Sequence, residues 1–167
     1  MNREAFNERL LAEFGPDVVL GCSSFRDEIT AVVEAGSIVR ICRFLRDDPE
    51  LAFDFLTFVG GVDRYRDQPR FEVVYQLYSI KFNHRCRIKA LIPETEESGA
   101  CIDSVFEVWP SADWHERETA EMFGITFNNH PDPRKLLLPE EWTVYPLRKD
   151  FPLEGTSEAT PDLPHQG

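Results

Sequence analysis

Long apolar runs are absent from this sequence. Nowhere do the roughly 18 consecutive apolar residues of a bilayer-spanning helix occur. Residues 1–10 alternate charged and polar side chains and lack the apolar centre of a secretory signal. We therefore expect a soluble chain in the cytosol that makes no direct membrane span.

Closely spaced cysteines are also missing. The four cysteines (Cys22, Cys42, Cys86 and Cys101) are scattered, with no Cys-x-x-Cys pair. Zinc and iron–sulfur sites draw their ligands from such pairs, so these residues are interpreted as reduced thiols that are buried or incidental. The histidines show no metal-ligand spacing, and neither a Gly-x-x-x-x-Gly-Lys loop nor a Gly-x-Gly-x-x-Gly motif is present. The sequence predicts that this chain binds no metal and no cofactor.

Positive charge is scarce. The chain has 18 Lys and Arg against 30 Asp and Glu, for a net charge of −12. Such a charge repels phosphate backbones and anionic lipid headgroups, so neither nucleic acid nor a bare lipid surface is an expected partner. Any approach to a membrane would go through another protein.

What the sequence does have is enough apolar material for a packed core. Its 167 residues are 42% hydrophobic, with 13 Phe. This length corresponds to one domain, and the aromatic content predicts large apolar surfaces in the core or facing a partner. Disorder along the whole chain is excluded.

The first half of the chain predicts helices and short strands. Apolar spacing favours a helix over residues 2–14, followed by strands near 18–22 and 29–34. Ser37 is placed to cap a helix carrying Ile38, Ile41, Cys42 and Leu45 on one face. Asp48-Pro49 predicts the start of a further helix, with a stripe of Leu51, Phe55, Phe58 and Val59 ending at Gly60-Gly61.

Two strands with period-two alternation predict a hairpin. Residues 71–78 and 86–92 each place apolar side chains on one face and polar side chains on the other. The expected fold class is α+β, an antiparallel sheet with helices packed on one face. The basic row Arg85, Arg87 and Lys89 could bind phosphate, but pairing across strands with residues such as Glu72 is the favoured interpretation.

A compact helix is predicted over residues 112–123. Asp113 and Glu116 have the spacing of a capping box, and Gly124 is placed to end the helix. Seven of the twelve prolines lie in residues 131–167, which also carry many large apolar side chains. We therefore divide the chain into an α+β domain (residues 1–128) and an extended C-terminal docking segment (residues 129–167) that lies along its own body or another subunit.

The same helix holds two candidate carboxylates. Glu116 and Glu118 could form an acid/base pair as in a stand-alone hydrolase, but on a helix they project about 200° apart. Neither has a cation three or four residues away, so a buried carboxylate here would need an imported positive partner. The C-terminal docking segment, residues 129–167 and called the tail below, offers four candidates, Arg134, Lys135, Arg148 and Lys149.

Several stretches of the chain resemble one family. Residues 116–125 read ERETAEMFGI, residues 130–137 read HPDPRKLL, and residues 145–153 read YPLRKDFPL. Together with the motifs at 61–63, 70–75 and 83–85, the chain over 40–154 resembles the 30-kDa (C) subunit family of proton-pumping NADH:quinone oxidoreductase. Asn129 departs from the family, which more often has Gly there. The family-signature and interface residues carried over are Glu116, Arg117, Glu118, Phe123, Gly124, His130, Pro131, Arg134, Leu147, Arg148 and Phe151.

The resemblance implies a structural subunit of the peripheral arm without catalytic residues of its own. Its partners would be the large D (49-kDa type) subunit and the neighbouring B- and I-type Fe-S subunits, while FMN and the Fe-S clusters lie in other subunits. It would sit on the cytoplasmic side of the bacterial inner membrane. A homologous subunit of an energy-converting hydrogenase or an F420H2 dehydrogenase complex is the alternative within the same lineage.

Overall fold

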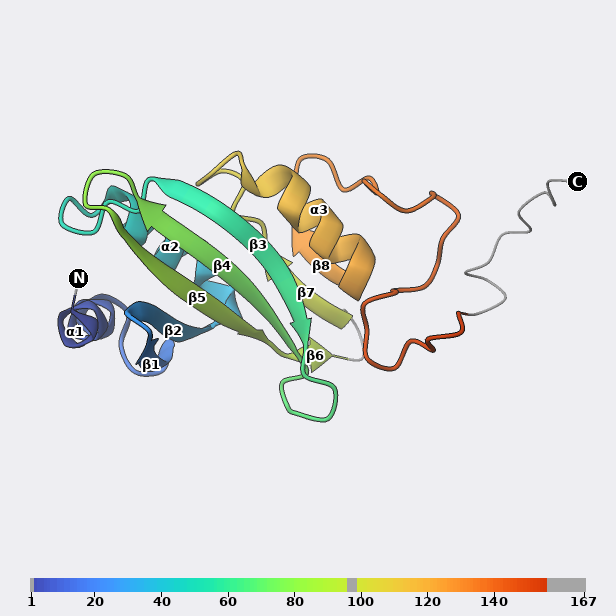
Figure 1. The fold of residues 1–167 in the computed structure, drawn as a ribbon, viewed down its shortest axis with the longest axis horizontal. Helices are drawn as coiled ribbons and strands as arrows, with labels where there is room; N and C mark the ends of the chain where they lie inside the picture. Colours follow the sequence, from blue (N-terminus) through green and yellow to red (C-terminus); the bar gives the residue numbers. More distant parts are fainter. Residues whose placement is uncertain (1, 96–98, 156–167) are drawn as a thin grey trace, which may run out of the picture.

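A five-stranded sheet forms the centre of the structure, a computed structural model that describes residues 2–95 and 99–155. The strand order is β1-β2-β5-β4-β3. Figure 1 shows this sheet as a twisted layer with α1 beside one end and α3 beside the other. The strands are β1 (Val19–Phe25), β2 (Glu28–Glu34), β3 (Phe55–Asp63), β4 (Phe71–Ser79) and β5 (His84–Ile92).

Helices α1 (Arg3–Phe14) and α2 (Ile38–Asp47) bury one face of the sheet. They pack on each other through Phe14 and Phe44, whose ring centroids are 5.5 Å apart. The predicted stripe of α2 is confirmed, since all four of its apolar residues are fully buried. No helix in the described part of the chain is both long and apolar enough to cross a membrane.

A second, smaller sheet carries helix α3 (Ala112–Phe123). Its strands are β6 (Glu94–Thr95), β7 (Gly99–Asp103) and β8 (Ile125–Asn128), with β7 and β8 parallel. Parallel neighbours need a crossover connection, and α3 provides it. The helix also packs along β3, so it joins the two sheets (Figure 1).

The predicted hairpin is confirmed as β4 and β5, which pair antiparallel from Phe71 opposite Ile92 to Ser79 opposite His84. Their inward side chains are fully buried, while the outward row carries ion pairs. Arg87 contacts Glu28 at 2.5 Å and Lys89 contacts Glu72 at 2.9 Å. Cross-strand pairing is therefore correct for these two cations.

The prediction of a purely antiparallel sheet is wrong in one place. Strands β2 and β5 run parallel, from Ile29 opposite Cys86 to Glu34 opposite Leu91. The chain leaves β2 through α2 and returns by the β3–β4–β5 meander, which brings β5 in beside β2 in the same direction. The α+β class is confirmed, but the sheet is mixed.

The helix predicted after Asp48-Pro49 is also wrong. Asp48 closes only one turn, accepting hydrogen bonds from the amides of Glu50 and Leu51, and Ala52 ends it with φ of +43°. The chain then enters β3, where a bulge between Leu56 and Phe58 disturbs the alternation and mimics helical spacing.

Gly60 and Gly61 do not end a helix. They lie inside β3, where the ring of Phe58 covers Gly60 and the ring of Phe123 covers Gly61. A Cβ atom at Gly61 would come within 2.6 Å of the Phe123 ring. Because these two glycines have no side chain, α3 can approach the sheet closely.

The two predicted helix caps, Ser37 and the capping box of Asp113 and Glu116, differ from the structure. Ser37 and Ser111 occupy the cap positions of α2 and α3, but neither side chain makes a capping hydrogen bond. The capping box predicted from Asp113 and Glu116 does not form, because Glu116 points into the core instead. Gly124 ends α3 in the left-handed conformation, as predicted.

Replacing Gly61 with Ala should destabilise the protein by about 1–3 kcal/mol, because the added methyl group forces the Phe123 ring and α3 away from β3. Chemical denaturation of the full chain measures this loss. Gly21→Ala in β1 is the matched control, since no atom lies within 4 Å of the added Cβ. Equal stability of the two variants would contradict the close packing of α3 on β3.

Candidate functional site

The signature residues gather around α3, where the tail passes along the helix. At the C-terminal end of α3, the Arg148 guanidinium donates from Nε to the Phe123 carbonyl at 2.6 Å, and the Leu147 amide donates to the Met122 carbonyl at 3.1 Å. The last carbonyls of a helix lack intrahelical donors and carry partial negative charge, so an arginine satisfies both needs there. Glycine is favoured at position 124, because φ is +69° and a Cβ atom would lie 2.6 Å from the Tyr145 ring.

Glu121 holds the middle of the tail. Its buried carboxylate accepts hydrogen bonds from three consecutive amides, those of Leu136, Leu137 and Leu138, at 2.9 to 3.2 Å. Hydrogen bonds to a charged acceptor are stronger than neutral ones. This carboxylate therefore fixes a segment that has no regular secondary structure of its own.

Arg117 and His130 hold the start of the tail. Arg117 donates to the carbonyls of Arg134 and Lys135 at 2.8 and 3.2 Å and lies 3.5 Å from the Asp132 carboxylate. The Asp132 amide donates to Nδ1 of His130, which must therefore be unprotonated there. The ring proton then sits on Nε2, which faces the Asp113 carbonyl at 3.2 Å.

Asp63 receives the far end of the tail. Arg70 binds its carboxylate through two hydrogen bonds of 2.9 and 2.8 Å, and the Lys149 amide donates to it at 2.8 Å. Arg70 also contacts Asp150 at 2.9 Å. Hydrogen bonding from Arg70, above all, holds the pKa of Asp63 well below its usual range, so it is charged at neutral pH.

Glu116 is the most buried charged residue of the site, with no exposed surface. Its carboxyl group accepts hydrogen bonds from the Ser104 hydroxyl at 2.5 Å and the Val105 amide at 2.8 Å. Burial raises the pKa of Glu116 to about 7 despite the lowering effect of these two hydrogen bonds, and the Asp113 charge adds a smaller increase.

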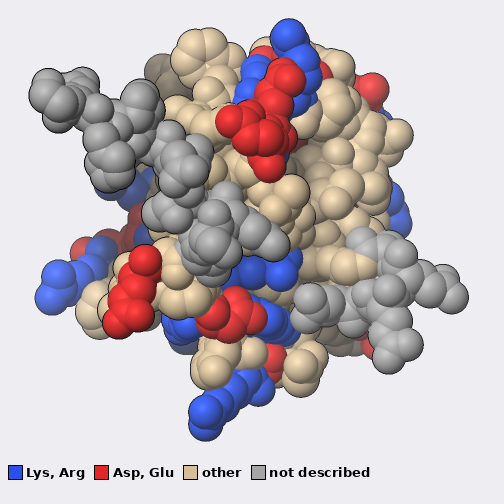
Figure 2. All heavy atoms as spheres, turned by 90° about the vertical axis from the view of Figure 1, so that its right-hand side faces the viewer, with Lys and Arg blue, Asp and Glu red and all other residues tan. Residues whose placement is uncertain are grey.

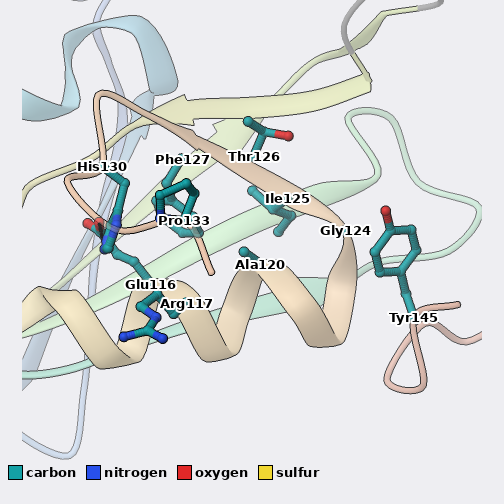
Figure 3. Close-up of a pocket in the computed structure, with 10 residues that line it drawn as sticks. All are labelled: Glu116, Arg117, Ala120, Gly124, Ile125, Thr126, Phe127, His130, Pro133 and Tyr145. Carbon is teal, nitrogen blue, oxygen red and sulfur yellow. Dashed lines mark ion pairs between the residues drawn. The ribbon is translucent and has the colours of Figure 1, made fainter. Parts of the chain in front are cut away.

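Glu116 and His130 lie at one end of a cavity of about 230 Å³ between α3 and β8, and Tyr145 closes the other end (Figure 3). Apolar side chains such as Ala120 and Ile125 line its middle. Glu118 is exposed and does not line this cavity. The two-carboxylate arrangement of a hydrolase is therefore not formed by Glu116 and Glu118.

The prediction that a tail cation neutralises a buried carboxylate of α3 is wrong. No lysine or arginine within the described ranges lies at ion-pair distance from Glu116, which hydroxyl and amide donors satisfy. Lys135 instead contacts carbonyl oxygens, Arg134 contacts Asp132, and Arg148 contacts carbonyl oxygens and aromatic rings. Arg148, for example, lies over the rings of Phe71 and Tyr145.

The other predicted residues lie at the edges of this contact. Pro131 and Arg134 are exposed, and Arg134 pairs with Asp132 at 2.7 Å. Phe151 is half-buried, and its amide closes a turn onto the Arg148 carbonyl. Leu147 has 54% of its surface exposed.

Sequence reasoning missed Glu121, Ser104 and Arg70 as parts of the site. The only hint in the sequence is the leucine run before Pro139. Its backbone amides need acceptors if the segment is buried, and no regular helix or strand is predicted there to supply them. Asp63 and Arg70 stand out in the sequence only within family-like motifs, and the contact of Asp63 with Lys149 in the tail spans 86 residues.

Comparison with known proteins decides the family. Residues 31–157 match the family model described as the respiratory-chain NADH dehydrogenase 30 Kd subunit. This chain belongs to that family. The matched residues include α3, Asp63 and the part of the tail that contacts them, so these contacts lie within the region that the family shares.

Relatives support the same family, and a solved structure shares the fold. The C-type subunit of the NADH-quinone oxidoreductase of Roseiflexus castenholzii is 48% identical over 138 residues, covering 83% of this chain and 78% of the relative. That of Geobacter metallireducens is 46% identical, covering 82% of each. The fold also matches a chain of the membrane-bound sulfane sulfur reductase, an archaeal respiratory membrane complex, with a TM-score of 0.71 and 24% identity over 90% of this chain and 85% of that one.

The buried Glu116 predicts a pH-dependent stability. Its pKa of about 7 in the fold is above the ordinary value of 4.5, so its contribution is complete below about pH 4.5 and is lost as the pH rises through about 7. Glu116→Gln should reduce the loss of unfolding free energy between about pH 5 and pH 8 by up to about 3 kcal/mol. Urea denaturation at both pH values measures it. Glu118→Gln is the control, and an unchanged pH slope in Glu116→Gln would contradict the assignment.

Removing the Glu121 carboxylate should release the tail. Glu121→Ala leaves the amides of Leu136, Leu137 and Leu138 without their acceptor, at a cost of about 1.5–3 kcal/mol. Hydrogen exchange should accelerate at these amides and remain slow in β4 and β5. Glu118→Ala on the exposed side of the same helix should leave all of them unchanged. Retained protection of the three amides in Glu121→Ala would show that other contacts hold the tail.

Proposed function

We propose that this chain is a structural subunit of the peripheral arm of a proton-translocating NADH:quinone oxidoreductase. The observation that carries the proposal is the family match across α3 and the tail, with relatives that are 46 to 48% identical and are named as the C-type subunit of NADH-quinone oxidoreductase. These names favour this assembly over a hydrogenase or F420H2 dehydrogenase. The complex transfers electrons from NADH to quinone, and this chain's part is to position other subunits.

The proposed chemistry lies in other subunits. Electrons would pass from NADH through FMN and Fe-S centres held by neighbouring chains, and this chain would bind none of these groups. The polar groups of α3 support that role, because Arg117 and Glu121 bind the tail and Glu116 binds Ser104 and Val105 of the body. The chain would be peripheral on the cytoplasmic side of the inner membrane, attached through its partners.

The tail surface is the proposed contact with the large D (49-kDa type) subunit. The tail's backbone is held against the body, but several of its side chains point outward, with Leu137 exposed by 61% and Leu147 by 54%. Trp114 on α3 is 65% exposed. Figure 2 shows this end of the molecule, where charged groups border a broad uncharged area. Burying such apolar side chains against a partner contributes about 1.5–3 kcal/mol each.

B- and I-type Fe-S subunits are the proposed further neighbours. Charged pairs that are only partly buried, such as Arg70 with Asp150, suit the polar rim of such a contact. An assembly of this kind explains why an acidic chain keeps large apolar groups such as Trp114, Leu137 and Leu147 exposed.

Substituting Leu137 and Leu147 with Ser should reduce co-purification of the D subunit with the tagged chain by about tenfold or more, because two apolar contacts are lost. The isolated variant should keep its unfolding free energy, since both side chains are exposed. Leu20→Ser is the matched control on β1, where Leu20 is 51% exposed. Normal assembly of the tail variant, or NADH oxidation by the isolated chain, would refute the proposal.

A further inference from the structure

A polar pocket of about 680 Å³ lies at the end of the five-stranded sheet where the β1–β2 and β4–β5 turns meet. The register places the turns side by side, since Ile29 follows the first turn and pairs with Cys86, which follows the second. Arg26 and Arg85 line the pocket from the two turns, together with Arg87. The tail contacts described for α3 and Asp63 involve neither turn.

Two of the pocket's cations have no carboxylate partner. Arg87 pairs with Glu28, but the side chain of Arg85 makes no hydrogen bond, ion pair or ring contact within residues 2–95 and 99–155. Arg26 contacts only the ring of Phe25, at 5.2 Å. The pocket lining holds three arginines against two carboxylates, Asp27 and Glu28, and Glu28 is already paired with Arg87. In a chain with a net charge of −12, this is a local excess of positive charge.

The turn that carries Arg26 is conformationally costly. Arg26 and Asp27 have φ of +50° and +63°, and both connect Phe25 to its partner Glu28. A two-residue turn of this kind favours Asn-Gly, because other residues are strained at positive φ. A strained position that holds a cation beside a pocket points to a use for that cation.

Apolar groups surround the same pocket. Phe25, which lines it, is 74% exposed, and Ile80 and Phe82 in the β4–β5 turn are 65% and 41% exposed. A free anion would leave these groups in water, whereas a polypeptide would cover them. An anionic lipid surface carries many charges and would meet the chain's net charge of −12, whereas a single carboxylate meets only the groups of the pocket.

We propose that this pocket receives an aspartate or glutamate side chain from another subunit, whose carboxylate pairs with Arg26 and Arg85 while its apolar neighbours cover Phe25. The surface would be a second contact with a partner protein, at the sheet end away from the tail. It rests on the proposed function, because it requires that the chain be part of an assembly. Paired arginines of this type add specificity as well as affinity.

Carbodiimide coupling within the purified complex tests this contact. Arg85→Lys places an amine in the pocket, and a carbodiimide joins an amine to a carboxylate in contact with it. Mass spectrometry should then find an amide link between position 85 and an Asp or Glu of another subunit. Arg66→Lys is the matched control, because Arg66 is exposed, contacts only the ring of Tyr65 and lies outside the pocket.

A complex that contains the Arg85→Lys chain but gives no link from position 85 to another subunit would overturn the inference while leaving the proposed function intact. An unmodified chain that joins no complex would refute the proposed function and this inference with it. Reversing both charges, with Arg26→Glu and Arg85→Glu, should lower incorporation by about tenfold, whereas Arg66→Glu should not. Charge-dependent flotation of the chain with phosphatidylglycerol vesicles, without a link to another polypeptide, would assign the pocket to lipid and also overturn it.

Discussion

Carboxylate groups on the folded body accept hydrogen bonds from backbone amides that have no partner in a helix or strand. Glu121 accepts three amides of the tail, Asp63 accepts those of Tyr65 and Lys149, and Glu116 accepts that of Val105. A buried amide without an acceptor costs about 1–3 kcal/mol, so an irregular segment can lie against a protein only if such acceptors are present. The course of the chain after β8 depends on these carboxylates.

Proline reduces the number of acceptors required. Between residues 131 and 155 the chain has five prolines, which carry no amide hydrogen, and several remaining amides close single turns, as at Trp142 and Phe151. The three leucine amides before Pro139 donate to no carbonyl of a turn, and the Glu121 carboxylate accepts their hydrogen bonds instead. Proline content and buried carboxylates thus act together: they reduce or satisfy the need of the tail backbone for acceptors, while side chains such as Leu137 and Leu147 remain exposed.

Local periodicity is sufficient to predict much of the fold. The β4–β5 hairpin, α1 and α2 are predictable because each has a regular apolar pattern of its own, and the predicted apolar face of α2 is correct to the residue. Helix α3 has no clean apolar stripe and is predictable from its end signals, of which the Gly124 stop is correct. The strand β3 resembles a helix in sequence because its bulge breaks the alternation of apolar residues and its two glycines look like a helix stop. The glycines are instead covered by the rings of Phe58 and Phe123, and Phe123 is distant in sequence. The parallel pairing of β2 with β5 likewise depends on the path of the chain and not on any local pattern.

For the site, the sequence points to the correct helix and tail but to the wrong chemistry between them. The expectation of charge pairs follows from counting the cations of the tail. In the structure, however, most contacts between α3 and the tail join a side chain to a backbone carbonyl or amide, and backbone groups do not appear in a sequence pattern. This difference matters for assembly. A tail held by salt bridges to its own body would compete with a partner's charges, but a tail held largely through its backbone leaves exposed side chains such as Leu137 and Leu147 available. The same residues can therefore be required for the fold through their main chain and for binding a partner through their side chains, so a substitution confined to an exposed side chain separates the two roles.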